Sequence, residues 1–142
     1  MDKRARARTL FFMKPLHHPS IKDVTVEGIL HALSDPVRVA IFADIASSAG
    51  SKTCSSFLCV REQSIPKSTL SQHFKALRDA GLIRSERQGV EMRNTSRCDE
   101  IHTRFPGLLR AILEAHQTQR AEKSQAGKAT RSRSTLRSRN SA

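Results

Sequence analysis

The feature that most constrains this fold is a run of fourteen residues, 67–80, with apolar side chains at helical spacing. Leu70, Phe74 and Leu77 lie within about 60° of one another on a helical wheel of ~100° per residue. Gly81 follows, and glycine is common directly after a helix. We therefore expect an amphipathic helix from Lys67 to Ala80 whose apolar stripe packs inward.

The outward arc of this predicted helix is short-chained and polar. It holds Ser68, Thr69, Ser71, Gln72 and Lys75, with Lys67 at its start. Serine, threonine and glutamine can form hydrogen bonds with base edges in the DNA major groove, whereas lysine suits phosphates. A simpler interpretation is an ordinary amphipathic helix whose polar face is only solvated. The segments that flank the helix favour DNA binding over this interpretation.

Two short strands are expected after this helix, at Leu82–Glu86 and Val90–Asn94. Gln88-Gly89 predicts a tight turn between them, because glycine adopts positive φ without strain. Arg84, Arg87 and Arg93 lie on the predicted hairpin. An arginine-edged hairpin behind a polar helix is typical of a winged helix-turn-helix, whose wing contacts phosphates or the minor groove.

Two helices are expected upstream. Val26, Ile29, Leu30 and Leu33 have helical spacing, and after Ser34-Asp35-Pro36 so do Val37, Ile41 and Ile45. Asp35 or Ser34 can cap the second helix, with Pro36 at its first position. A shorter apolar piece, Phe57–Val60, is expected to form a short helix.

A last helix is expected from about Pro106. One face of it carries Leu108, Leu109, Ile112 and Leu113, and His116 is a further candidate for this face. An apolar stripe on the last helix of so small a domain is a candidate dimer surface.

Basic charge is concentrated at the two ends of the chain. Of the net charge of +12, residues 1–22 supply six Lys/Arg and one Asp, and residues 120–142 seven Lys/Arg and one Glu. The segment between them is nearly neutral, although 61–97 is locally basic. We therefore expect a basic arm at 1–22, a folded domain at 23–119 and a disordered basic tail at 120–142.

The remaining composition excludes several protein classes. Cys54, Cys59 and Cys98 form no even disulfide framework and no CxxC pair, which favours free thiols in a reducing cytosol. The apolar run Leu10–Met13 is too short for a signal peptide or a membrane span. A soluble, cytoplasmic protein is expected, and no recognisable catalytic spacing predicts an enzyme.

Two motifs resemble the ArsR/SmtB family of transcriptional repressors. Leu33-Ser34-Asp35-Pro36-Val37-Arg38 looks like the family's "LxDPxR" motif, and the run from Ser68 to Ile83 closely resembles its recognition helix and first wing strand. The resemblance covers roughly 26–115. It implies a homodimer formed by the first and last helices, for which Ile29, Leu30, Leu108, Leu109, Ile112 and Leu113 are the candidates. It also implies that the homodimer binds an inverted-repeat DNA operator and that an inducer releases it from this DNA.

The inducer stays open between alternatives. Leu58-Cys59-Val60-Arg61-Glu62 faintly resembles the family's metal-binding "LCVCD", but Arg61 replaces the second thiolate, and Glu100, His102 and His116 only loosely match its second metal pattern. Thiol sensing by Cys54 or Cys59 fits better, since Lys52 could lower a thiol pKa, although inert cysteines are simpler.

These observations predict a mainly α fold with a small β-hairpin wing. The expected function is that of a homodimeric, DNA-binding repressor in the bacterial cytoplasm, without cofactor or metal. The alternatives are an RNA-binding or non-specific nucleoid protein acting through the basic ends, and a metal-sensing repressor.

Overall fold

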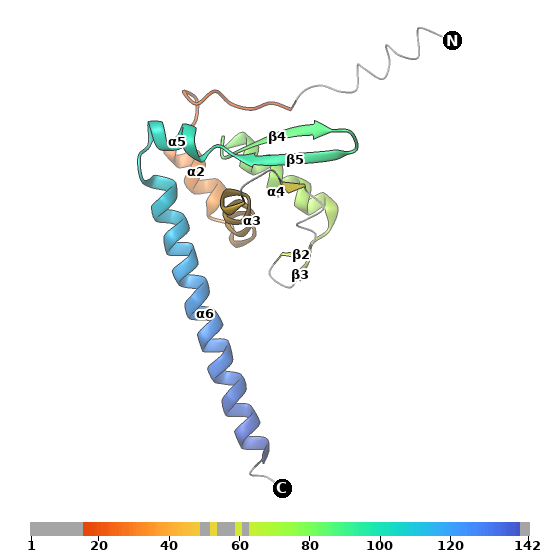
Figure 1. Cartoon of the computed structure of the whole chain (residues 1–142), viewed down its shortest axis with the longest axis vertical. Coiled ribbons are helices and arrows are strands. Elements are labelled where there is room, and N and C mark those ends of the chain that lie inside the picture. Colours follow the sequence, from red (N-terminus) through yellow and green to blue (C-terminus); the bar gives the residue numbers. More distant parts are fainter. Residues whose placement is uncertain (1–15, 49–51, 54–58, 61–62, 140–142) are drawn as a thin grey trace, which may run out of the picture. The chain divides into compact units, whose positions relative to one another are not determined.

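The structure is a computed structural model that describes residues 16–48, 52–53, 59–60 and 63–139. The chain divides into two units, Met1–Arg104 and Phe105–Ala142, each considered by itself. Unit 1 contains, in chain order, α2 (Val26–Leu33), α3 (Pro36–Ser47), β1 (Lys52–Thr53), β2 (Cys59–Val60), β3 (Gln63–Ser64), α4 (Lys67–Asp79), β4 (Ile83–Gln88), β5 (Glu91–Ser96) and α5 (Cys98–Arg104). Unit 2 contains α6 (Leu108–Arg139) (Figure 1).

The predicted break between α2 and α3 is confirmed. The side chain of Asp35 caps α3, accepting hydrogen bonds from the backbone N–H groups of Val37 and Arg38 at 2.8 and 3.0 Å. Pro36 occupies the first helical position, where its missing N–H costs nothing. Burial opposes ionisation of Asp35, but the two N–H groups and the Arg38 charge outweigh it and lower the pKa of this carboxyl.

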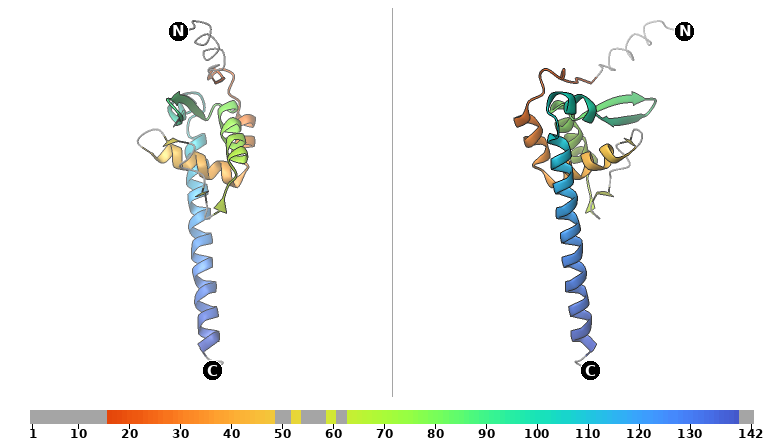
Figure 2. Two further views of the ribbon diagram at one scale, coloured as in Figure 1. Left: turned by 90° about the vertical axis from the view of Figure 1, so that its right-hand side faces the viewer. Right: turned by 60° about the vertical axis from the view of Figure 1, so that its left-hand side comes forward.

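The core of unit 1 lies between the helices and the inner face of the β4–β5 hairpin. Helix α3 contacts α2, α4 and β5, and α4 contacts β4. Figure 2 shows α2, α3 and α4 packed together with the hairpin on one side of them. The largest buried side chains are those of Ile29, Ile41, Phe42, Ile45, Phe74, Leu77, Leu82, Ile83 and Ile101. The predicted inward stripe of α4, completed by Leu70 at 3% exposure, is therefore confirmed.

The predicted hairpin is also confirmed, with its turn one residue later than expected. Strands β4 and β5 pair antiparallel from Ile83↔Ser96 to Gln88↔Glu91, so Gly89 and Val90 form the turn. Gly89 has φ +63°, which glycine adopts without strain. Strand β1 pairs with the other edge of β5, giving the order β1-β5-β4.

The helix weakly predicted at Phe57–Val60 is wrong in its described part. Cys59–Val60 is strand β2, which pairs antiparallel with β3, while 54–58 lie outside the described residues. Val60 is β-branched and favours strands, and both Cys59 and Val60 rank below the straight-chain residues in helix propensity. The short apolar run could not distinguish these two states.

Residues 120–139, for which disorder was expected, belong to α6, which continues as one helix to Arg139, while 140–142 lie outside the described residues. The second half of α6, 124–139, has four Arg, two Ala, one Lys and one Gln, which are good helix formers, and contains no proline. The helix begins at Leu108, two residues after Pro106, because Gly107 takes φ +81° in the preceding turn. No helix of the described part of the chain is long and apolar enough to cross a membrane.

The N-terminal boundary of the folded part also differs from the prediction at residue 23. Residues 16–22 are described and form hydrogen bonds within unit 1, and we call Leu16–Lys22 the strap. Residues 1–15 of the predicted basic arm lie outside the described residues. Unit 1 ends at Arg104 instead of near 119.

Candidate nucleic-acid interface

The N-terminal half of α4 presents the polar surface that the sequence predicts. Ser68, Thr69, Ser71 and Gln72 are all exposed, whereas Leu70 between them is buried. The first-turn N–H groups of a helix carry partial positive charge that favours phosphate. The exposed Lys67 adds a full positive charge at this end. This surface offers hydrogen-bonding groups for bases beside a positive end for the backbone.

Lys75 on the same face is paired within the helix. Its ammonium lies 2.6 Å from the Asp79 carboxylate, and the two side chains are 67% and 49% exposed. Exposed ion pairs of this kind contribute only about 0–1 kcal/mol to stability. Lys75 can therefore exchange the Asp79 carboxylate for a DNA phosphate at little cost. The pair is compatible with the phosphate contact predicted for Lys75.

The three predicted wing arginines lie on two faces of the hairpin. Arg87 is paired with Met92 in the strand register, whereas Glu86 is paired with Arg93. Neighbouring residues of a strand point to opposite faces, so Arg84 and Arg93 share one face and Arg87 takes the other. Among the described residues, Arg93 is 3.9 Å from Glu91, and Arg87 is exposed near the hairpin tip.

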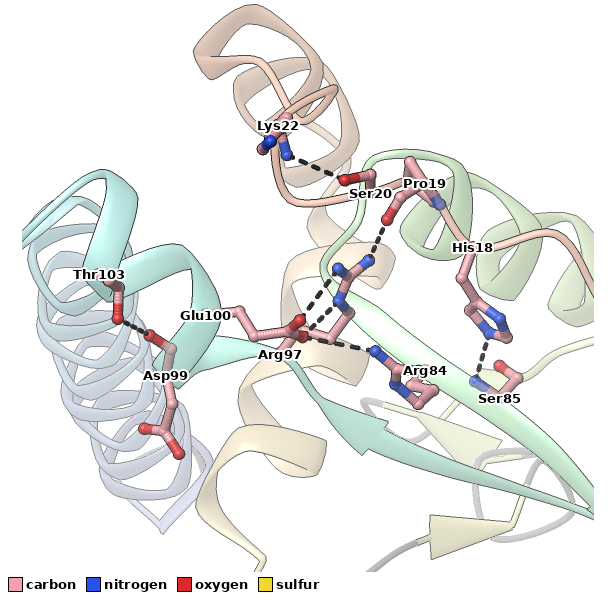
Figure 3. A network of polar contacts seen from close by, with 10 residues as sticks. All are labelled: His18, Pro19, Ser20, Lys22, Arg84, Ser85, Arg97, Asp99, Glu100 and Thr103. Carbon is pink, nitrogen blue, oxygen red and sulfur yellow. Dashed lines mark hydrogen bonds and ion pairs between the residues drawn. The ribbon is translucent and has the colours of Figure 1, made fainter.

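Arg84 is directed toward α5 and the strap. Its guanidinium lies 3.7 Å from the Glu100 carboxylate (Figure 3). The hydrogen bond from Arg97, followed by the charges of Arg97 and Arg84, lowers the pKa of Glu100 against a smaller opposing effect of burial. Arg84 therefore has a structural partner in addition to the phosphate contact predicted for it.

Arg97, between β5 and α5, was not singled out by the sequence and is the best-buried arginine of this site. Its side chain is 3% exposed. It donates to the Glu100 carboxylate at 2.7 Å and to the Pro19 carbonyl oxygen at 2.8 Å. Pro19 lies 78 residues away in sequence, so no local pattern could have revealed this contact.

His18 of the strap contacts the outer edge of β4. Its Nε2 accepts a hydrogen bond of 2.9 Å from the Ser85 backbone N–H (Figure 3). On the inner side, the buried Ser85 hydroxyl donates to Asn94 Oδ1 at 2.6 Å. The strap therefore satisfies a backbone donor that an edge strand would otherwise leave unpaired.

The hydrogen bond from Ser85 requires neutral His18, because a protonated Nε2 has no lone pair to accept with. Burial lowers the pKa of His18, as do the positive charges on the neighbouring elements, while one carboxylate opposes them. The charges are those of Arg84, Arg78 and Arg97, and the carboxylate is Glu86.

A pH-dependent stability follows from this environment. Because the pKa of His18 is lower in the folded chain than its ordinary value of about 6.5, its stabilising contact is present above that pH. The contact is lost as the pH falls below about 6.5 and through the folded-state pKa. Urea unfolding at pH 7.5 and 5.5 should show a larger loss of stability in the natural chain than in the His18→Gln variant. Equal losses would show that His18 is not linked to folding.

The predicted thiol site is only partly described. Cys54 lies outside the described residues, and Cys59 belongs to β2 without a described side chain. Cys98 is half-buried, and burial raises the pKa of its thiol, which reduces the reactive thiolate at neutral pH. Among the residues that the structure describes, no group of three or more His, Cys, Asp or Glu could hold a metal ion.

The residues predicted for dimer contacts differ in exposure. Ile29 has no exposed surface in the single chain and belongs to the core of unit 1, so it is not available to a second chain. Its place in the apolar stripe of α2 points inward. Leu30 is 50% exposed on the same helix. In unit 2, Leu109 is buried, while Leu108, Ile112 and Leu113 are partly exposed.

Comparisons with known proteins agree with this architecture. Residues 33–86 match a family model described as a helix-turn-helix domain. Over 85 residues the chain is 35% identical to YceK of Bacillus subtilis (strain 168), an uncharacterised HTH-type transcriptional regulator, covering 59% of this chain and 82% of that protein.

Two solved structures are similar as well. An ArsR-like transcriptional regulator from Rhodococcus sp. RHA1 is 24% identical, with a TM-score of 0.47, covering 70% of this chain and 91% of its own. Another ArsR family transcriptional regulator is 21% identical, with a TM-score of 0.46, covering 77% and 97%.

The helices, the exposed arc of α4 and the hairpin occur in the order of a winged helix-turn-helix. The family model spans this order from the end of α2 into β4. YceK, which the chain matches over 82% of that protein's length, is named as an HTH-type transcriptional regulator. The chain belongs to the HTH-type transcriptional regulators and contains a DNA-binding winged helix-turn-helix domain.

Proposed function

We propose that this chain is a homodimeric repressor that acts in the cytoplasm, binds an inverted-repeat DNA operator and is released by an inducer. The observation that carries the proposal is the exposed polar arc of α4, directly followed by the arginine-bearing hairpin. Ser68, Thr69, Ser71 and Gln72 are proposed to lie near bases. Lys67, Lys75, Arg84, Arg87 and Arg93 are proposed to lie near phosphates.

The dimer is proposed from apolar surface that each unit exposes. Leu30 in α2 is half exposed, and Leu108, Ile112 and Leu113 line part of α6. Exposed apolar patches on small domains commonly mark protein contacts. An inverted repeat follows from such a dimer, because a two-fold axis presents two copies of α4 to two half-sites.

Release from DNA is proposed to follow either oxidation of a thiol or binding of a small organic inducer. Cys54 and Cys59 are the thiol candidates, since Cys98 is half-buried with a raised pKa. Operator binding measured in parallel with reductant, oxidant, zinc and chelator separates thiol from metal sensing. A response to zinc and chelator alone would replace thiol sensing by the metal-sensing alternative.

The Gln72→Ala variant should discriminate less well between operator and scrambled duplex. A side-chain contact to a base edge contributes about 1–3 kcal/mol of discrimination, so we expect a loss of roughly 5- to 150-fold, measured by fluorescence anisotropy. Gln117→Ala removes another exposed glutamine, from α6, and should leave discrimination unchanged. Equal discrimination by the natural chain and Gln72→Ala would refute the assignment of Gln72.

The Arg87→Ala variant should weaken binding to both duplexes by a similar factor. Loss of one phosphate contact lowers the slope of log affinity against log salt by about 0.9. Titrations over a range of salt concentrations measure that slope. Arg87→Lys keeps the charge and should keep the slope, whereas a loss confined to the operator would mean that Arg87 contacts a base.

The alternative of RNA or nucleoid binding through the basic ends keeps one supporting observation. Residues 120–133 of α6 are exposed and carry five Lys or Arg against one Glu. A chain lacking 1–14 and 120–142 distinguishes the two functions. Specific operator binding should survive in the repressor, whereas loss of all nucleic-acid binding would favour the alternative.

A further inference from the structure

The middle and second half of α6 form a regular helix that is exposed on every side. All residues from Gln117 to Arg133 are exposed, and the helix continues through them without a break (Figure 1). The apolar residues proposed for the dimer end at Leu113, so the dimer contact does not account for this segment. Its surface is therefore considered by itself.

Most of the positive charge in this segment lies on one face of the helix. At ~100° per residue, four of the five Lys and Arg residues between 120 and 133 fall within an arc of about 140°. At ~1.5 Å per residue they extend over about 16 Å of the helix axis. Glu122 and Arg133 lie on the opposite face. We call the four the basic stripe, and they are Arg120, Lys123, Lys128 and Arg131.

The charges of the basic stripe are not neutralised within unit 2. The ion pair that Arg110 forms with Glu114 lies earlier in α6. Among the residues that the structure describes, no carboxylate pairs with Arg120, Lys123 or Lys128. Like charges three residues apart on a helix destabilise it, and the basic stripe contains two such pairs. A bound polyanion would remove this repulsion.

Gly127 lies in the middle of the basic stripe without a conformational or packing reason in the described part of the chain. Its φ is not positive, and a side chain there would meet nothing within 4 Å. Glycine in a helix interior weakens the helix. Ser124, another small residue, lies beside it on the same face. The two leave the helix backbone open to close approach by a partner, between the cations.

We propose that the basic stripe lies in the major groove of duplex DNA, with its cations on the phosphates and Gly127 toward the bases. The major groove of B-DNA is wide enough to admit an α-helix, whereas that of an RNA duplex is deep and narrow. A membrane surface would require large apolar residues on the helix, and 117–133 contain none. The contact goes beyond the proposed function, because it adds affinity outside α4 by neutralising phosphates.

The first test removes the charge of the basic stripe. In the stripe variant of the full chain, glutamine replaces all four cations, since its helix propensity is close to that of Lys and Arg. The slope of log affinity against log salt on a DNA duplex of mixed sequence should fall by roughly 3, at about 0.9 per phosphate contact. The affinity itself should fall on the order of tenfold. Circular dichroism verifies that the helix content is retained.

Two single replacements separate a bound face from total charge. Arg131→Gln removes a cation of the basic stripe and should lower the salt slope by about 0.9. Arg133→Gln removes the same side chain two residues later, from the opposite face, and should leave the slope unchanged. Both arginines are exposed and both replacements change the net charge equally, so a difference reports the face that binds.

A further test changes shape at constant charge. Gly127→Gln places a long neutral side chain in the middle of the basic stripe. The affinity for DNA should fall by roughly threefold or more, because the phosphates are held further from the cations. Helix content should rise, since glutamine is a better helix former than glycine. Ala129→Gln puts the same side chain on the opposite face and should leave the affinity unchanged.

Three results would overturn the proposal: an unchanged salt slope in the stripe variant, equal effects of Arg131→Gln and Arg133→Gln, or full affinity of Gly127→Gln. An RNA duplex of the same sequence that loses as much affinity as DNA in the stripe variant would overturn it as well. The proposed function is tested apart from these outcomes, because discrimination between operator and scrambled duplex should persist in the stripe variant. Its absence from the natural chain would reject the proposed function instead.

Discussion

The Phe74→Ala variant is expected to lose about 3–5 kcal/mol of unfolding free energy. Phe74 is 1% exposed and lies between Leu70 and Leu77 on the inward stripe of α4. Its removal deletes a large buried ring and leaves a cavity where α4 meets α3 and β4. Since small domains are stable by only about 5–15 kcal/mol, this single change removes a large part of the total. Urea unfolding followed by circular dichroism measures it.

Two further variants make this result interpretable. Ser71→Ala changes an exposed residue of the same helix and should alter stability by no more than about 0.5 kcal/mol. If Phe74→Ala does not fold, Phe74→Leu retains most of the buried apolar volume and should lose about 1 kcal/mol. A loss below that value in a folded Phe74→Ala chain would contradict the packing of α4 described above.

The Arg97→Ala variant has the second largest expected effect, a loss of about 3 kcal/mol. The buried guanidinium joins the Glu100 carboxylate to the Pro19 carbonyl, so its removal breaks both contacts and opens a gap in the packing. We place the value at the lower end for buried pairs because Glu100 is 43% exposed and water can solvate it. The Ser85 amide should also exchange its hydrogen faster, because the strap loses its central anchor.

Arg110→Ala is the matched control for Arg97. Arg110 forms an ion pair of nearly the same length with Glu114, at 2.8 Å, but its side chain is 81% exposed. An exposed pair competes with water, so the unfolding midpoint should not change measurably. Similar effects of the two substitutions would show that burial of Arg97 does not stabilise unit 1.

The parts of the fold that local patterns encode were predicted well. The boundaries of α4, the cap at Asp35 and the β4–β5 hairpin follow from residues close together in the chain. The four polar residues assigned to bases are exposed, because helical periodicity places them opposite the buried stripe. The observed hairpin turn lies one residue later than the predicted turn, because Gly89 can occupy either central position of a tight turn.

The remaining features depend on contacts that are distant in sequence. The hydrogen bond that ties the strap to β4 joins Ser85 to His18, which lie 67 residues apart, and no spacing rule connects such positions. Ile29 was assigned to the dimer surface because a helical stripe does not reveal which side of it a neighbour covers, and the core covers it fully. The second half of α6 has a polar composition that disorder and a solvated helix share, so charge alone could not separate them.

Selection of duplex DNA from a random pool is the most direct test of the central claim, that α4 reads DNA sequence. The natural chain should enrich a common sequence with two inverted half-sites, and Gln72→Ala should change the enriched bases at only one or two positions in each. Failure of the natural chain to enrich any sequence would contradict the claim. An identical enriched sequence for a chain altered at Ser68, Thr69, Ser71 and Gln72 together would contradict it equally.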